Sequence, residues 1–275
     1  GRGPGLGARL LCLRGSEAHR SLPGIEPTAH FDLTGLDQFP ESALARALGG
    51  DFAFDPFRSF HQIREPTQDH VERAAAQFLA VESRIEVTCA GRTDTGVHAL
   101  EQVVHLDASV DREEMAWVRG MNRFLPPSVR VLWMQPVPDA FHARFSAVSR
   151  TYQYLLLVDR TEPALLRDKA GWFHQALDVE AMRAAAATLL GEHDFSSFRS
   201  SECQAKSPVK CMHGIAIEDR APFIHFTLRA NAFLHHMVRN IVGALVYVGA
   251  GRMTLAQFGA MFAARDRTLA PPTFS

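Results

Sequence analysis

Apolar and polar positions change their period several times along this chain, and each change marks a predicted element. Residues 71–79 carry apolar side chains at helical spacing, and residues 85–89 alternate as a half-buried strand does. Further strands are predicted over residues 102–106, 129–134, 151–158, 215–217 and 223–228, and a long apolar helix over residues 233–248. Strands interleaved with helices in two similar halves predict an α+β protein with two packed lobes.

The other predicted helices are defined by residues that cap their ends. Asp111 is a good N-cap for a helix that continues through Arg123. Asp178 caps an alanine-rich helix for which Gly191 is the expected C-terminal glycine. Thr254 opens a last helix that runs to residue 264. These boundaries are predicted from chemistry at the helix ends.

The chain is predicted to fall into three parts. Residues 1–50 are turn-rich and lack a sustained period, so we expect this divergent segment to be poorly ordered or loosely packed, and we assign it no role. Residues 51–145 are expected to form an N-terminal lobe and residues 146–275 a C-terminal lobe. The boundary between the lobes is expected near residues 140–150.

Charge and cysteine content narrow the classes of protein. A formal net charge of −1 carries no overall basic signature, so any surface for nucleic acid must be local. Four cysteines without a CxxC pair fit reduced thiols in an intracellular protein. The chain lacks a run of about 18 apolar residues, so no membrane-spanning helix is expected. The arginine- and glycine-rich start resembles a transit peptide, but Leu10–Leu13 is too short for a secretory apolar region, and we expect a cytoplasmic protein.

One carboxylate, Asp94, lies in a polar loop between two predicted strands, with Arg92 two residues before it. A carboxylate near a guanidinium is one way to hold an ionised nucleophile or base ready for chemistry. Asp-Thr-Gly is also good turn chemistry, so a plain hairpin turn is an equal alternative. The same triplet occurs in aspartic proteases, but that mechanism needs two such aspartates, and this chain has no second copy.

Arg239 lies within the apolar segment 233–243. An arginine there needs a carboxylate or phosphate partner, or it must extend to water along the helix edge, and the residues alone leave both possibilities open. His235 and His236 suggest a metal, but adjacent residues point apart on a helix and no further ligand stands at a suitable spacing. A metal site is therefore not expected.

Tyr152 and Tyr154 alternate along one strand and so face the same side. Ordinary core packing is the default for such aromatic residues. Basic residues interleaved with aromatic ones also suit a cleft that stacks bases and binds phosphates, and His142, Arg144 and Arg150 lie just upstream. A second basic cluster, Arg199, Lys206 and Lys210, is weak evidence, because such clusters are usually solvated faces.

Several blocks of the chain together resemble the tRNA pseudouridine synthase A family. They are Ala90–Ala99, Phe141–Ser146, Arg150–Tyr154, Asp194–Phe198 and Phe233–Gly243. Several blocks in order are far more specific than one short motif. The resemblance implies the two-lobed pseudouridine synthase fold, with mixed, mainly antiparallel sheets flanked by helices and a central cleft. It also makes residues 51–145 the catalytic lobe.

The resemblance further implies an activity and residue roles. The enzyme would isomerise uridine to pseudouridine at positions 38 to 40 in the anticodon stem-loop of tRNA, as a homodimer that grips each tRNA across both subunits. Asp94 would be the catalytic nucleophile, Arg92 would hold the flipped-out nucleotide, Tyr152 would stack on the target uracil, and Arg239 would pair with Asp94. The carboxylate supplies covalent catalysis, so no cofactor or metal is implied.

The sequence departs from the family pattern in three places. Thr95 stands where the family more often has alanine. Residues 54–63 lack the glycines and the tryptophan of the family's opening motif, and the chain stops where the family continues into a closing strand. We therefore carry an alternative, a catalytically impaired tRNA-binding relic with a truncated C-terminal lobe.

Overall fold

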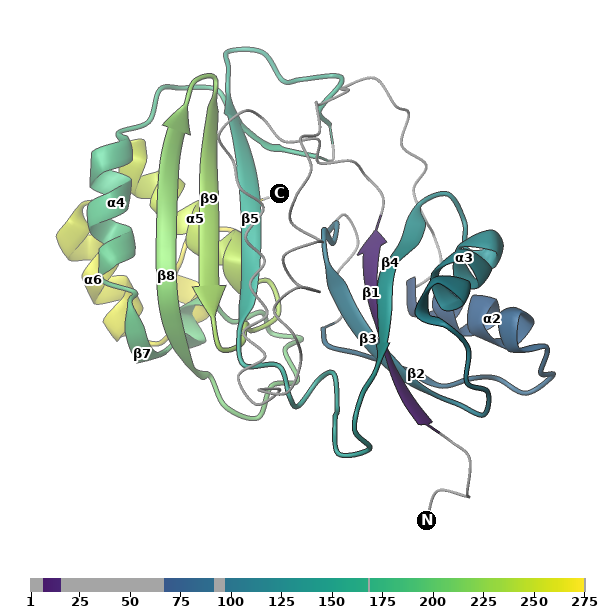
Figure 1. The fold of residues 1–275 in the computed structure, drawn as a ribbon. Helices are drawn as coiled ribbons and strands as arrows, with labels where there is room; N and C mark the ends of the chain where they lie inside the picture. The colour runs from purple at the N-terminus through teal and green to yellow at the C-terminus, as the bar shows by residue number, and fades with distance from the viewer. Residues whose placement is uncertain (1–6, 16–66, 92–96, 168, 275) are drawn as a thin grey trace. The chain divides into compact units, whose positions relative to one another are not determined.

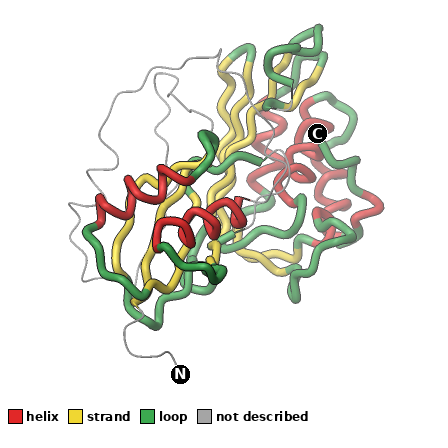
Figure 2. Tube along the Cα trace, turned by 90° about the vertical axis from the view of Figure 1, so that its right-hand side faces the viewer, coloured by secondary structure: helices red, strands yellow, loops and turns green. Residues whose placement is uncertain are grey.

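The computed structural model describes residues 7–15, 67–91, 97–167 and 169–274. The chain divides into two compact units, Gly1–Val148 and Ser149–Ser275. Each unit combines a β-sheet with helices, as the tube in Figure 2 shows. This confirms the predicted α+β class with mixed, mainly antiparallel sheets.

The first unit is built on a four-stranded antiparallel sheet in the order β2-β3-β1-β4 (Figure 1). Its strands are β1 (Gly7–Gly15), β2 (Val87–Cys89), β3 (Gln102–Ala108) and β4 (Val129–Pro136). Helices α2 (Thr67–Leu79) and α3 (Glu114–Phe124) pack against each other and cover the sheet. Trp117 and Met121 of α3 are fully buried between the helices and the strands.

Two expectations for the first unit are wrong. Residues 7–15 lie in the segment expected to be loosely packed, yet they form β1 between β3 and β4. Backbone pairing on both sides satisfies the donors and acceptors of β1, and the short apolar run did not reveal this from the pattern alone. Asp111 is not the N-cap of α3, because the helix begins after Glu113. The carboxylate of Asp111 instead accepts a hydrogen bond from Nη2 of Arg9 at 2.8 Å.

The second unit is built on a five-stranded sheet in the order β6-β5-β9-β8-β7. The strands are β5 (Arg150–Val158), β6 (Gly171–Phe173), β7 (Gly191–Asp194), β8 (Val209–Arg220) and β9 (Phe223–Ala230). β5 and β6 are parallel, and the other pairs are antiparallel. β6 and β7 were not predicted, because three or four residues are too few to show a period.

Three helices and two short 3₁₀ turns complete the second unit. They are α4 (Val179–Ala187), α5 (Met237–Gly249), α6 (Leu255–Ala263), η1 (Ser196–Phe198) and η2 (Arg267–Leu269). Most of α5 is buried in the core of this unit, between the sheet and the other helices. This burial fixes the position of the first turn of α5 relative to the sheet of the same unit.

The predicted helix caps of the second unit have mixed outcomes. Asp178 caps α4 by accepting a hydrogen bond from the Ala181 backbone at 2.9 Å, and Thr254 caps α6 in a capping box with Gln257. Gly191 does not end α4, which stops at Ala187; with a φ of +92° it opens β7 instead. A positive φ suits glycine at either position, so the residue type alone did not separate the two.

Candidate active site

The Asp94 loop connects two paired strands, as predicted. β2 and β3 are antiparallel, and the backbone N–H of Ala90 donates to the carbonyl of Val103 at 2.8 Å. The Gln102 side chain donates to the carbonyl of Gly91. Asp94 and Arg92 themselves lie outside the described residues.

The length of the connection between β2 and β3 can be compared with that of a tight hairpin turn. The connection leaves β2 after Cys89 and enters β3 at Gln102. Tight hairpin turns span about two to five residues, so the connection is longer than such a turn. Asp94, Thr95 and Gly96 lie outside the described residues, so the hairpin turn and the chemical interpretation of the loop both stay predictions.

Tyr152 and Tyr154 lie on β5 and face the side of the sheet on which α5 packs. Tyr152 is opposite Leu228 of β9, and Tyr154 is opposite Phe226. The ring of Tyr152 meets the ring of Phe233 edge-on, with 4.9 Å between centroids. Both tyrosines are half-buried, so the strand carries an aromatic face that is only partly used for packing.

The hydroxyl of Tyr154 is buried without a hydrogen-bond partner among the described residues. It lies against the backbone of Gly171 on β6, where an added Cβ would come within 2.2 Å of the oxygen. Burial raises the pKa of Tyr154 to about 12, although the positive charge of Arg239 acts in the opposite direction. Tyr154 therefore stays neutral at physiological pH.

Arg239 lies in the first turn of α5, half-buried and close enough to Tyr154 to influence its ionisation. The structure thus brings Arg239 to the tyrosine strand within the second unit. No local pattern predicted this proximity, because the two segments are separated by more than eighty positions, whereas the family resemblance implied that Tyr152 and Arg239 act at one site. The Arg239 guanidinium gives this part of the unit a permanent positive charge.

The segment before α5 is not helical, which corrects the predicted helix start at Phe233. α5 begins at Met237, and His236 precedes it in a left-handed conformation with a φ of +58°. The rings of His235 and His236 therefore do not point apart; they stack with 3.9 Å between centroids. No group of three His, Cys, Asp or Glu side chains that could hold a metal ion exists within the described ranges.

Cys203 anchors this segment before α5. The backbone N–H of His235 donates to Sγ of Cys203 at 3.4 Å, and Nη2 of Arg199 donates to the carbonyls of Cys203 and Ala205 at 2.8 and 2.9 Å. Burial alone would raise the pKa of the Cys203 thiol, but the N–H groups of His235 and Ala205 and the charge of Arg199 outweigh it and lower that pKa. The sequence carried no signal for this contact, because it joins residues far apart in the chain.

The basic cluster of Arg199, Lys206 and Lys210 has a structural explanation for two of its members. Arg199 binds the carbonyls just described, and Nζ of Lys210 donates to the carbonyls of Ser207 and Val209 at 2.7 and 2.9 Å. Lys206 is exposed. Two of these cations therefore order the loop before β8, which accounts for them without a ligand.

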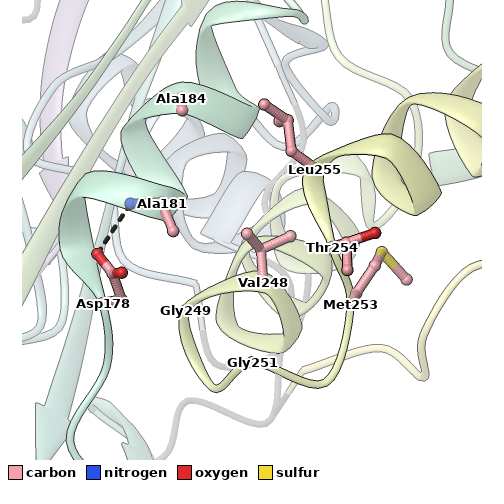
Figure 3. A pocket seen from close by; sticks show the side chains of 9 residues that line it. All are labelled: Asp178, Ala181, Ala184, Val248, Gly249, Gly251, Met253, Thr254 and Leu255. Carbon is pink, nitrogen blue, oxygen red and sulfur yellow. Dashed lines mark hydrogen bonds between the residues drawn. The ribbon is translucent and has the colours of Figure 1, made fainter.

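A hollow of about 400 Å³ lies apart from the tyrosine strand, among α4, α5 and α6 (Figure 3). Ala181, Val248 and Leu255 contribute apolar walls. Its carboxylate, Asp178, and its hydroxyl, Thr254, are both engaged in capping helices. The hollow is therefore a gap between the ends of packed helices.

A membrane-spanning helix would need a long apolar stretch, and no helix in the part of the chain that the structure describes has one.

Comparison with known proteins identifies the class. A family model described as tRNA pseudouridine synthase matches residues 44–146 and 185–275. A tRNA pseudouridine synthase A from Bordetella petrii is 60% identical over 212 residues, which cover 77% of this chain and 79% of the relative. Proteins of the same name from Paraburkholderia phytofirmans and Burkholderia mallei are 54% and 56% identical over 211 and 207 residues, 77% and 75% of this chain and 77% and 76% of the relatives.

These matches extend over both units of the fold. They define an isomerase of the class that converts uridine to pseudouridine in tRNA. The chain belongs to the tRNA pseudouridine synthase family.

Proposed function

We propose that this protein isomerises uridines at positions 38 to 40 in the anticodon stem-loop of tRNA, with Asp94 as the nucleophile. The ionised carboxylate attacks either the uracil ring or ribose C1′, and the bond between N1 and C1′ breaks. The freed uracil turns, C5 bonds to C1′, and the bond to the carboxylate breaks. C5 loses its proton and N1 gains one, so the reaction balances as an isomerisation without oxidant or reductant.

The observation that carries this proposal is the meeting of Arg239 with the tyrosine strand. Arg239 supplies a permanent positive charge next to Tyr154, and Tyr152 follows the same face of β5. A guanidinium paired with Asp94 would favour the ionised carboxylate that a nucleophile needs. Tyr152 would stack on the target uracil, and Arg92 would hold the flipped-out nucleotide.

The family resemblance also supports a proposal for the oligomeric state and the location of the protein. We propose a cytoplasmic homodimer in which each tRNA contacts both subunits. Light scattering of the purified chain, alone and with tRNA, tests the dimer: a monomeric mass in both conditions would contradict it.

Tritium release tests the chemistry. The protein is incubated with tRNA tritiated at uridine C5, and a second tRNA carries cytidine at positions 38 to 40. We expect release from the first tRNA only, and an Asp94→Asn variant should lose at least about a thousandfold of the rate. Asp219→Asn, which changes an exposed carboxylate on β8, is the matched control and should keep full activity. Release that survives Asp94→Asn would refute the nucleophile, and release from the second tRNA would refute the positions.

The role of Arg239 has a separate readout. If Arg239 holds Asp94 ionised, Arg239→Gln should raise the pH at which activity is lost on the acid side, whereas Arg239→Lys should largely restore the profile. A uniform loss of activity with an unchanged pH profile would instead indicate a structural role.

One alternative function is the catalytically impaired relic, which residues 54–63 favour because they depart from the family motif. Binding of tRNA without any release of tritium would support this alternative.

A further inference from the structure

Three aromatic rings form a ladder from the interior of the first unit to its surface. His105 of β3 is only 7% exposed, and the His142 ring meets it at a centroid distance of 5.0 Å. The Phe145 ring stacks on His142 with 4.2 Å between centroids and an angle of 28° between the planes. Phe145 is 79% exposed, so the ladder ends in an aromatic ring that faces solvent.

The turn that carries Phe145 is fixed by hydrogen bonds. The backbone N–H of Ala143 donates to Nδ1 of His105 at 3.1 Å, which attaches the turn to β3. The backbone N–H of Phe145 donates to Nδ1 of His142 at 3.3 Å, and that of Ser146 donates to the His142 carbonyl at 2.8 Å. The outward position of Phe145 is therefore built into the turn before any ligand binds.

The exposed ring contributes little to the core. One of its faces lies on His142, and at 79% exposure the other face is open to water. A single exposed apolar residue is ordinary, but a rigid stacked pair with an open face is the geometry on which a nucleobase stacks. Arg144 and Ser146, on either side of Phe145, are exposed and polar, which suits contact with a nucleic-acid backbone.

We propose that Phe145, supported by His142, is a stacking platform for an unpaired base of the tRNA substrate. The inference rests on the proposed function, because it takes tRNA as the ligand. Extruding a target nucleotide removes stacking from its neighbours, and an aromatic ring presented by the protein replaces part of that lost stacking. Arg144 adds positive charge next to the platform for a phosphate of the same strand.

Replacement of Phe145 tests the platform by equilibrium binding of fluorescently labelled tRNA. Phe145→Ala should raise the Kd for tRNA by about 5- to 100-fold, the range found for removal of one stacking residue. Phe145→Leu should weaken it similarly, because leucine is apolar but cannot stack, whereas Phe145→Trp should keep the affinity. Leu165→Ala removes an equally exposed apolar side chain, 75% exposed in the second unit, and should bind as the wild type does.

Two further measurements separate the possible failures. Melting temperatures of the Phe145 variants should match the wild type, and in Phe145→Trp tRNA should quench the added tryptophan fluorescence. Wild-type protein that neither binds tRNA nor releases tritium would overturn the proposed function and the platform together. Wild-type protein that binds, with Phe145→Ala or Phe145→Leu binding equally well, would overturn the platform alone. A change of oligomeric mass in RNA-free Phe145→Ala would also overturn it, since the ring would then be a contact between copies of the chain.

Discussion

Asn240 and Arg267 are hydrogen-bonded across the second unit, with 3.2 Å between Oδ1 of Asn240 and Nη2 of Arg267. Asn240 follows Arg239 on α5 and is 1% exposed. Its amide also donates to the carbonyl of Phe198 at 2.9 Å and accepts from Oγ1 of Thr273 at 2.7 Å. One buried side chain thus joins α5 to η1, to η2 and to the segment after η2, directly beside the arginine of the candidate site.

Asn240→Ala should therefore destabilise the protein by about 1–3 kcal/mol, because the carbonyl of Phe198 and the guanidinium of Arg267 lose a buried partner. Thr273→Val removes the bond to Asn240 and a 3.3 Å bond from Nη2 of Arg267, but Thr273 is exposed and water can replace both partners, so this change should cost about 1 kcal/mol or less. Urea unfolding monitored by circular dichroism measures both. Equal midpoints for Asn240→Ala and the wild type would contradict the structural role.

The Tyr154 hydroxyl should make stability depend on pH in the alkaline range. Burial raises its pKa from 10.0 to about 12 in the folded chain, so the folded state holds this proton more tightly than the unfolded state. Stability is therefore unaffected by this group below pH 10.0, where the hydroxyl is protonated in both states, and falls as the pH rises from 10.0 to about 12. Tyr154→Phe should remove this pH dependence.

The same variant should change stability little at neutral pH, because the hydroxyl has no hydrogen-bond partner among the described residues. Absorbance titration at alkaline pH and thermal melts at pH 7 and pH 11 measure the two effects. A titration curve that is the same in Tyr154→Phe and the wild type above pH 11 would show that the late-titrating group is another residue.

Glu72 and Asp69 should respond differently to neutralisation although both approach Arg84. Glu72 is 3% exposed and accepts from Nε of Arg84 at 2.6 Å, and also from the Gln68 side chain and the Val87 backbone. Asp69 lies 3.4 Å from Arg84 and is exposed. We expect Glu72→Gln to cost about 1–3 kcal/mol and Asp69→Asn less than about 0.5 kcal/mol.

The contribution of Glu72 to the free energy of unfolding should also disappear at acid pH. Burial alone would raise the pKa of Glu72, but its hydrogen bonds and the charge of Arg84 outweigh burial and bring that pKa below 4.5. Its stabilisation is therefore full above pH 4.5 and is lost as the pH falls through the lower folded value. Chemical denaturation at pH 7 and pH 3 should show the gap between wild type and Glu72→Gln narrowing; a constant gap would contradict this.

Two helical glycines offer a matched test of packing. A Cβ on Gly120 of α3 would lie 2.1 Å from the Phe78 ring, which packs edge-on against buried Trp117. A Cβ on Gly259 of α6 would meet no atom within 4 Å. Gly120→Ala should therefore destabilise by about 1–3 kcal/mol, whereas Gly259→Ala should stabilise by about 0.5–1 kcal/mol. Thermal unfolding of the two variants checks the opposite signs, and stabilisation by both would contradict the close packing of α2 on α3.

The sequence by itself determined the elements whose signals are local. The caps at Asp178 and Thr254 were predictable because each side chain bonds a backbone group three residues away. The alternation in β5 showed that Tyr152 and Tyr154 share one face, since side chains in a strand repeat every second residue. The motif blocks indicated the family, which the comparisons confirm.

Only the tertiary structure decided the features that depend on distant residues. β1 is a strand because β3 and β4 pair with it on both sides, and α5 starts at Met237 where Cys203 holds the preceding backbone. The proximity of Arg239 to Tyr154, and the contact of His142 with His105, likewise join side chains that no local period relates. Local rules govern which backbone conformation a segment adopts, whereas burial and pairing between distant segments decide which side chains meet.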